Sequence, residues 1–380
     1  MVLTVDREQV QAYRIATQEL HRAHGDLGGL AVLGLGVQDA QQVSARLAIA
    51  ARLDVEPGAL AGESFAEALT AAEVTLAWSH RGAPHLHHVR DLPQVAAAMV
   101  PLNDADAQAR LSWQRTRVAK AGVPATEALT AATTALNRIV DKTMTKGAAS
   151  EAVTKVLPEG LVDWCRGCQA THIHEQLMRL ATLRAGIRLE PDVSPATLTP
   201  IDSQGQIAAT PDPAACTRVV EQYLHLHGPA TLTEAAGFMT TTKGVAKDMW
   251  PGELADVELN GKRVFLAQQD ISALENPPEP DFVRLLPPSD PLLQARDRLT
   301  LVPDKANRKA IWRIIGNPGV VLDGGEIVAT WRAAAKGRKR LGVTVSPLWT
   351  LRRSVRAAVE TEAARVAGAR DFDAIAVTFE

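Results

Sequence analysis

The chain has 380 residues, of which 46% are hydrophobic and 22% charged, and its mean hydropathy is −0.05. These values are typical of a globular protein and exclude a fibre or a disordered chain. Its apolar runs are shorter than the ~18 residues of a membrane helix, and its N-terminus turns charged too early for a secretory signal. With three cysteines, it lacks a disulfide framework, so we expect a cytoplasmic protein.

The charge of −2 is unevenly distributed along the chain. Residues 301–370 hold 14 Lys or Arg against 5 Asp or Glu, and the densest run is Lys336, Arg338, Lys339 and Arg340. A basic end on an acidic body suits a protein that contacts phosphates through one face. A solvated surface loop is the alternative interpretation of this run.

The N-terminal region reads as three helices followed by two strands. Helical spacing of apolar residues predicts helices over 6–20, 38–53 and 64–72, and strands over 75–81 and 85–89. The same order, with a shorter strand region, follows in the middle of the chain. There we expect helices over 126–140, 150–157 and 171–183, and a strand over 186–190.

The clearest local signal lies between residues 216 and 267. It predicts a helix over 216–227, a second over 233–239 capped by Thr233, and a third over 243–250. Two β-like runs follow, joined by Asn260-Gly261, the strongest short signal for a hairpin. Three helices and a hairpin are the order of a winged helix, whose third helix and hairpin face DNA.

Proline-rich stretches at 190–213 and 276–280 read as linkers, and the chain beyond them is mostly β-like. We expect strands over 319–323, 325–331, 341–345 and 374–379, with a helix over 351–367. The predicted class is therefore α+β, with three tandem winged-helix modules and a C-terminal α+β domain folded around a basic concave face. The expected boundaries are 1–120, 121–205, 206–280 and 281–380.

Four blocks, in order, resemble the DNA glycosylases of the AlkZ/YcaQ type and the wider bacterial winged-helix family around them. The blocks are Gly36 to Arg52, Trp78 to Leu86, Arg284 to Asp290 with Arg296, and Asp323 to Arg332. The resemblance implies binding to duplex DNA and hydrolysis of the N-glycosidic bond of alkylated or bulky purines. A non-catalytic winged-helix protein, acting as a regulator or a lesion binder, is the alternative within the same family.

The catalytic motif of these glycosylases is Gln-apolar-Gln or Gln-apolar-Asp at the entrance of the second helix. Counting back from Arg52, Gln38 takes the first place, Asp39 the middle and Ala40 the last, with Gln41 and Gln42 just beyond. One motif residue is kept and a carboxylate is offset by one place, about 100° on a helix. The resemblance makes Gln38, Asp39 and Gln41 the candidate catalytic residues, and a polar helix cap is the alternative role.

The chemistry of base excision explains why such residues matter. Breaking the bond builds positive charge on the sugar while water attacks C1′. A carboxylate can accept the water's proton and stabilise the charge, whereas a carboxamide can only orient the water.

The expected contacts to DNA come from basic residues and from one histidine pair. In a strand, His85 and His87 share a face, so together they can meet a phosphate from the wing. Asp290 forms a structural ion pair with Arg296 or Arg298, or else these arginines contact DNA. The full expected set is Arg52, Arg81, His85, His87, Arg296, Lys336, Arg338, Lys339 and Arg340.

Cys165, Cys168, His172 and His174 suggest zinc, but all four lie within ten residues. Structural sites usually separate two ligand pairs by ~12 residues or more, so we expect the cysteines to pack as small apolar side chains behind Trp164. A redox dithiol lacks its usual βαβ context.

We expect no metal and no cofactor. The segment Gly34 to Gly36 lacks the third glycine of a dinucleotide fingerprint, and an enzyme unrelated to DNA has no motif to support it. The expected protein is a monomer in the cytoplasm, associated with the nucleoid and with double-stranded DNA but not with a membrane.

Overall fold

The computed structural model describes residues 2–41, 43–56, 58–201 and 208–380. The chain forms two compact units, each built from separate stretches of sequence. Unit 1 comprises residues 1–73, 223–234 and 252–380, and unit 2 comprises 74–222 and 235–251. These units cut across the four expected segments, so the division into winged-helix modules stays a prediction. Among the described residues, no helix has the length and hydropathy that a membrane span requires.

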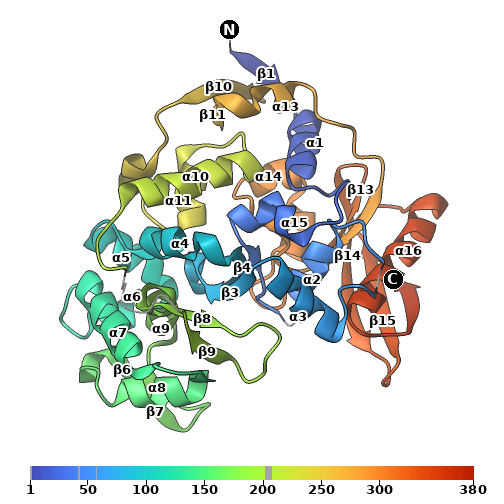
Figure 1. Cartoon of the computed structure of the whole chain (residues 1–380). Coiled ribbons are helices and arrows are strands. Elements are labelled where there is room, and N and C mark those ends of the chain that lie inside the picture. The colour runs from blue at the N-terminus through green and yellow to red at the C-terminus, as the bar shows by residue number, and fades with distance from the viewer. Residues whose placement is uncertain (1, 42, 57, 202–207) are drawn as a thin grey trace. The chain divides into compact units, whose positions relative to one another are not determined.

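The C-terminal part of unit 1 is a five-stranded sheet in the order β12-β13-β14-β15-β16 (Figure 1). Neighbouring strands are antiparallel except β15 and β16, which are parallel and joined by α16. The elements are β12 (Val283–Leu286), β13 (Gly319–Asp323), β14 (Glu326–Ala335), β15 (Arg340–Pro347), α16 (Arg353–Ala369) and β16 (Ala374–Phe379). All four strands and the helix expected beyond residue 318 are therefore confirmed, within a few residues.

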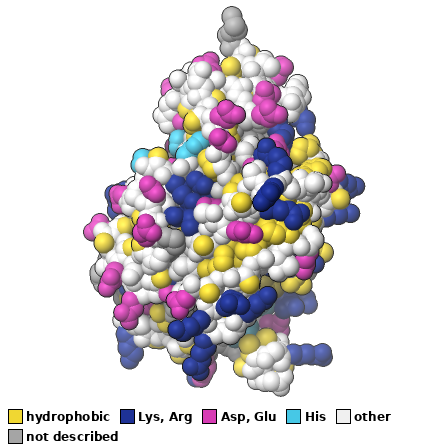
Figure 2. Space-filling model, turned by 90° about the vertical axis from the view of Figure 1, so that its right-hand side faces the viewer, with side chains coloured by type: hydrophobic (Ala, Val, Ile, Leu, Met, Phe, Trp, Pro, Cys, Tyr) yellow, Lys and Arg dark blue, Asp and Glu magenta, His cyan; other side chains and the backbone are white. Residues whose placement is uncertain are grey.

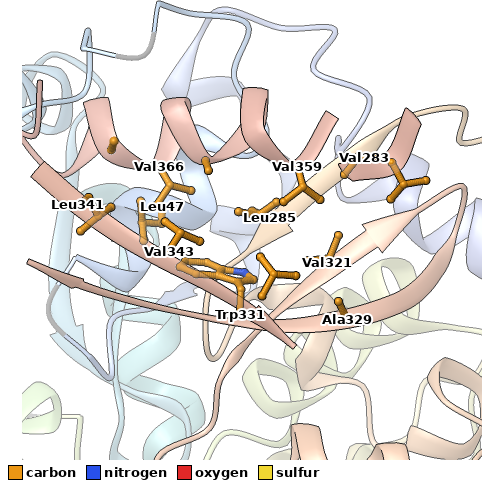
Figure 3. Close-up of a cluster of buried hydrophobic side chains, with 14 of the residues drawn as sticks. Leu47, Val283, Leu285, Val321, Ala329, Trp331, Leu341, Val343, Val359 and Val366 are labelled. Atoms are coloured by element: carbon orange, nitrogen blue, oxygen red, sulfur yellow. The ribbon is translucent and has the colours of Figure 1, made fainter. Parts of the chain in front are cut away.

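This sheet is buried on both faces, because side chains alternate along each strand. Val321 packs with the helix α16 on one face, where Val359 and Val366 of the helix point toward Val343 and Trp331 of the strands (Figure 3). Val320 and Leu322, one place to either side, join a second core on the opposite face. The uninterrupted apolar run of β13 is the sequence signature of this arrangement.

The remainder of unit 1 combines residues 1–73 with segments between residues 223 and 318. β1 runs parallel to β10, which forms a hairpin with β11, and α1 packs on this small sheet through Val10 and Tyr13. The elements are β1 (Leu3–Val5), α1 (Arg7–Thr17), β2 (Val37–Gln38), α2 (Ser44–Ala50), α3 (Gly62–Ala71), β10 (Leu254–Leu259), β11 (Lys262–Ala267), α13 (Ile271–Glu275), α14 (Arg298–Leu301) and α15 (Lys305–Ile311).

The hairpin expected at Asn260-Gly261 is confirmed, with φ of 50° and 74° at its two turn residues. Positive φ at both central positions is what a type I′ turn requires. The helix expected over 38–53 is partly wrong, since Gln38 ends β2 and α2 begins only at Ser44. Asp39 explains the delay, because its carboxylate caps the helix from outside it.

Unit 2 contains the strands in the order β4-β3-β8-β9-β5, the separate hairpin β6–β7, and most of the helices in the middle of the chain. Its elements are β3 (Val74–Trp78), β4 (Pro84–His88), α4 (Leu92–Met99), α5 (Asp104–Leu111), α6 (Arg115–Ala119), α7 (Ala125–Ile139), β5 (Met144–Thr145), α8 (Lys146–Thr154), β6 (Val162–Cys165), β7 (Ala170–Ile173), α9 (Glu175–Thr182), β8 (Ile187–Leu189), β9 (Thr197–Pro200) and α12 (Lys243–Ala246). The helix expected from residue 171 is wrong over its first residues, which form β7 and end at the N-terminus of α9.

Two helices run from one unit's sequence into the other's, namely α10 (Pro213–His227) and α11 (Leu232–Met239). The expected order of three helices and a hairpin is confirmed here, but the cap of α11 is not Thr233. Thr231 and Glu234 form a capping box instead, in which each side chain binds the other's backbone N–H at 3.3 and 2.7 Å.

Candidate active site and nucleic-acid interface

Gln38 and Asp39 lie at the end of β2, on the approach to α2. Oδ1 of Asp39 accepts hydrogen bonds from Ser44 Oγ at 3.1 Å and from the backbone N–H of Ala45 at 3.0 Å. The same serine hydroxyl donates to the backbone carbonyl of Gln38 at 3.3 Å. One carboxylate oxygen therefore holds the start of α2, which is the helix-capping role that the sequence left open. Gln38 and Asp39 are both half-buried.

The loop between Asp39 and α2 has an unusual backbone. Val43 has a φ of 63°, a left-handed conformation that is costly for a β-branched residue. Such strain is typical of segments that the surrounding structure forces into a functional geometry. The loop also exposes Gln41, whereas Gln42 lies outside the described residues.

Gln41 lines a small pocket of about 120 Å³ that lies entirely within unit 1. Its wall includes two arginines, Arg332 and Arg370, and burial lowers the pKa of Arg370. The pocket therefore offers a carboxamide and two cations to a ligand. Its other polar and aromatic lining residues include Ser44, Asn317 and Trp331.

Trp331 forms a rigid wall of this pocket because it is fixed on two sides. Its indole N–H donates to the carbonyl of Leu286 at 2.9 Å, and its ring lies against Gly319. A Cβ at Gly319 would come within 2.4 Å of the ring, so only glycine fits there. The sequence analysis did not identify Asn317, Trp331, Arg332 or Arg370 as pocket residues, although Trp331 and Arg332 belong to one of the blocks that carry the resemblance. Only the fold brings them together.

A larger cavity of about 710 Å³ lies in unit 2, along α7. Its lining residues include Thr130, Arg138 and Val156, and none of the expected catalytic or DNA-contacting residues lines it. We therefore base the candidate site on the smaller pocket beside Gln41.

Arg52 is fully buried in an ion pair with Asp290, which is also fully buried. Two parallel hydrogen bonds of 2.9 Å join the guanidinium to the carboxylate, and Nη1 also donates to the carbonyl of Ala48 at 2.7 Å. The structural ion pair of Asp290 thus exists, but its partner is Arg52 and not Arg296 or Arg298. Because the guanidinium is buried and bonded to Asp290, a phosphate cannot reach it. The expected contact of Arg52 with DNA is therefore wrong.

His85 and His87 share one face of β4, as expected, but that face is buried. Ser79 Oγ lies 3.0 Å from Nδ1 of His85 and 2.8 Å from Nε2 of His87. Burial lowers the pKa of His85 well below its ordinary value, so the ring is neutral at pH 7. The pair therefore cannot contact a phosphate, and the expected DNA contact of His85 and His87 is wrong. That expectation came from the likeness of this segment to a wing that faces DNA.

Arg81 and Arg296 are half-buried. The guanidinium of Arg81 lies 4.6 Å from the centre of the Phe238 ring, a cation–π contact. Burial lowers the pKa of Arg296. Both side chains thus contact the protein interior over part of their length, so only part of each side chain is accessible to DNA.

The most exposed of the expected cations lie in the turn between β14 and β15. Lys336, Arg338, Lys339 and Arg340 are all exposed, and Lys339 has one weak ion pair with Asp373 at 3.8 Å. On the face drawn in Figure 2, Lys and Arg side chains form several groups with Asp and Glu between them. A single basic face is therefore not seen on this side of the molecule. The cations of residues 336–340 are a cluster in the sequence.

Cys165 and Cys168 do not pack as buried side chains behind Trp164, contrary to the expectation. Cys165 is half-buried, Cys168 is exposed, and Trp164 is itself 56% exposed. The sulfurs and a ring nitrogen of His172 lie within 4.8 Å of one another, while His174 is not part of this group.

Two comparisons with known proteins place this fold among the AlkZ-like DNA glycosylases. A family model described as "DNA glycosylase AlkZ-like" matches residues 32–369, so the chain belongs to this family. The solved structure of Streptomyces sahachiroi DNA glycosylase AlkZ is similar to this chain, with a TM-score of 0.76 and 20% sequence identity over 100% of both chains. At that identity the likeness shows the shared α+β fold. No curated protein sequence matches the chain.

Proposed function

We propose that the protein is a monofunctional DNA glycosylase that hydrolyses the N-glycosidic bond of alkylated or bulky purines in duplex DNA. The observation that carries the proposal is the pocket of unit 1, whose wall holds Gln41 beside two arginines. Membership of the AlkZ-like family over residues 32–369 supports it. We further propose that the protein acts as a monomer on nucleoid DNA.

The reaction needs little from the protein because an alkylated purine is a good leaving group. The ring of such a base carries a positive charge, and it takes the electron pair of the glycosidic bond when it leaves. Water adds to C1′ of the sugar and gives up a proton. We assign the acceptance of that proton to Asp39, and the orientation of the water to Gln38 and Gln41.

Asp39 has a local reason to hold its position during this step. Its Oδ1 is bound to the N-terminus of α2 through Ala45, so the carboxylate is anchored on a helix and does not move as a free loop side chain would. The cap that fixes Asp39 is therefore compatible with a catalytic role.

We assign the DNA backbone to the exposed cations of the β14–β15 turn. Four cations within five residues produce a strong local positive potential. The strand β14, which leads into the turn, also carries Arg332 of the pocket. Contacts to phosphates position a protein on a duplex without reading its sequence. Such contacts suit an enzyme that meets a lesion in any sequence.

An apolar element beside the pocket also fits a DNA substrate. Ile314 and Ile315 are 102% and 86% exposed, in a loop closed by a hydrogen bond of 2.8 Å from the N–H of Arg313 to Asn317 Oδ1. Large apolar side chains rarely stand so fully in water. Proteins that deform duplex DNA insert such side chains between base steps, and we propose this role for the loop.

Reversing the charges at Arg338, Lys339 and Arg340 to glutamate should weaken binding to duplex DNA. The slope of log K against log salt should fall by ~0.9 for each phosphate contact removed. Titration of labelled duplex at several salt concentrations measures both quantities. The matched control reverses Arg263, an exposed cation of the β10–β11 hairpin. An unchanged slope in the triple variant, or an equal fall in the control, would place the DNA face elsewhere.

A non-catalytic DNA-binding protein is the second candidate function. Two observations favour it, namely that Asp39 already serves as a helix cap and that Ala40 stands at the last motif place. The two functions differ in one product. Incubation with duplex DNA containing 7-methylguanine releases free base faster than the duplex does alone only if the protein is a glycosylase.

A further inference from the structure

The hairpin of β6 and β7 carries a group of residues that the proposed glycosylase reaction does not use. β6 ends at Cys165, the turn contains Cys168, and β7 contains His172. The hairpin forms a two-stranded sheet and lies against α8, where the N–H of Ile173 donates to Thr154 Oγ1 at 2.9 Å (Figure 1). Two strands alone are marginally stable in water, so this element needs further support.

The register of the hairpin brings the three side chains to one side. Cys165 pairs with Ala170, and Asp163 pairs with His172. Residues directly opposite in an antiparallel pair share a face, and so do residues two apart on one strand. Cys165 and His172 are therefore diagonal neighbours on the same face. The turn that contains Cys168 brings its side chain back toward the other two. Eight residues of sequence therefore supply all three side chains, whereas structural zinc sites usually draw their ligands from separate segments.

The chemistry and the distances of this group match a zinc ion. Thiolates and imidazole are the ligands that Zn²⁺ prefers, at about 2.3 Å for sulfur and 2.0–2.1 Å for nitrogen. Ligand atoms of a tetrahedral site then lie about 3.4–3.8 Å apart. The three ligand atoms here lie within 4.8 Å of one another, so they need to draw together by no more than about 1.4 Å.

Hydrogen bonds around the group already prepare it for a metal. The backbone N–H groups of Cys168 and Gly167 and the side chain of His172 all make hydrogen bonds with the sulfur of Cys165. Nδ1 of His172 lies 2.9 Å from the carbonyl of Ile173, which leaves Nε2 as the ligand atom. Metal-bound histidines are usually oriented by such a bond from the other ring nitrogen.

We propose that Cys165, Cys168 and His172 bind one Zn²⁺ ion, which holds the β6–β7 hairpin closed. Binding replaces the thiol protons of the two cysteines, and water completes the four ligands on the exposed side of Cys168. This site goes beyond the proposed glycosylase function and is independent of it. It also reverses the expectation from spacing alone, which took no account of a hairpin.

Titration of the reduced, metal-free, full-length protein with Co²⁺ tests the proposal. We expect one ion per chain, with the thiolate charge-transfer absorption and the intense visible bands of a tetrahedral site. Cys165→Ser, Cys168→Ser and His172→Ala should each weaken binding by more than the ~10–100-fold typical of losing a partner that only orients a ligand. Far-ultraviolet circular dichroism should stay unchanged, because none of the three side chains is fully buried.

The controls are Cys216→Ala, which removes the buried third cysteine, and His174→Ala, which removes the neighbouring histidine outside the group. Both should bind Co²⁺ as the unaltered chain does. The proposal is overturned if no tetrahedral spectrum appears or if the Cys165→Ser variant binds as tightly as the unaltered chain. It is also overturned if protein isolated without reductant has a Cys165–Cys168 disulfide, since the pair is then a redox dithiol.

Discussion

Replacing Asp39 with asparagine should lower the rate of base excision by ~10²–10⁴-fold, as the loss of a general base does. Asparagine keeps the shape of aspartate and the Oδ1 atom that caps α2, so the fold should be retained. It cannot accept the proton of the attacking water. Single-turnover release of 7-methylguanine from duplex DNA measures the effect, and duplex affinity should barely change because Asp39 neutralises no phosphate.

The matched control for this variant is Asp6→Asn. Asp6 caps α1 through the N–H of Gln9 at 2.8 Å, in the same unit, but it is not among the residues assigned to the reaction. Gln38→Ala and Gln41→Ala should also reduce excision if these amides position the water. Parallel loss of duplex binding and excision in Asp39→Asn would mean instead that the entrance of α2 is purely structural.

Replacing Asp290 with alanine should destabilise the protein by about 3–5 kcal/mol, because it leaves the guanidinium of Arg52 buried without its counter-charge. Arg52→Ala should lower the free energy of unfolding by a similar amount, since it leaves the carboxylate of Asp290 buried without its counter-charge. Chemical denaturation followed by circular dichroism measures the free energy of unfolding. Replacing both residues with apolar ones, as in Arg52→Met with Asp290→Leu, should recover much of the loss.

Arg263→Ala is the matched control for the buried pair. It breaks the ion pair with Asp256, whose bonds of 2.6 and 2.8 Å are as short but lie at the surface. Exposed pairs contribute at most about 1 kcal/mol. If Asp290→Ala cost no more than this control, the assignment of Arg52 to the core would be wrong and a role in DNA contact would return.

The sequence predicted those elements whose signal is local. The hairpin at Asn260-Gly261 depends on two residues that tolerate positive φ, and β13 depends on an apolar run that suits a strand covered on both sides. The resemblance predicted the family correctly, and all of its blocks lie within the family match over residues 32–369. The resemblance did not predict which of the matched side chains are buried or which residues they contact.

The errors in the expected site have one physical cause, which is burial decided by tertiary packing. Arg52 and His87 have polar side chains of the kind usually found at the surface, yet both are completely buried in the fold. The partner of Asp290 lies 238 residues away, beyond any argument from spacing. In the same way, Cys165 and His172 meet only because a strand turns back on its neighbour.

The release of free base from alkylated duplex tests the central claim most directly. The unaltered protein should release 7-methylguanine from a duplex that it binds, leaving an abasic sugar with the strand intact, and Asp39→Asn should bind the same duplex without releasing base. If the unaltered protein binds alkylated duplexes and releases no base from any of them, the protein is a binding module and the proposed catalytic role of Gln38, Asp39 and Gln41 is contradicted.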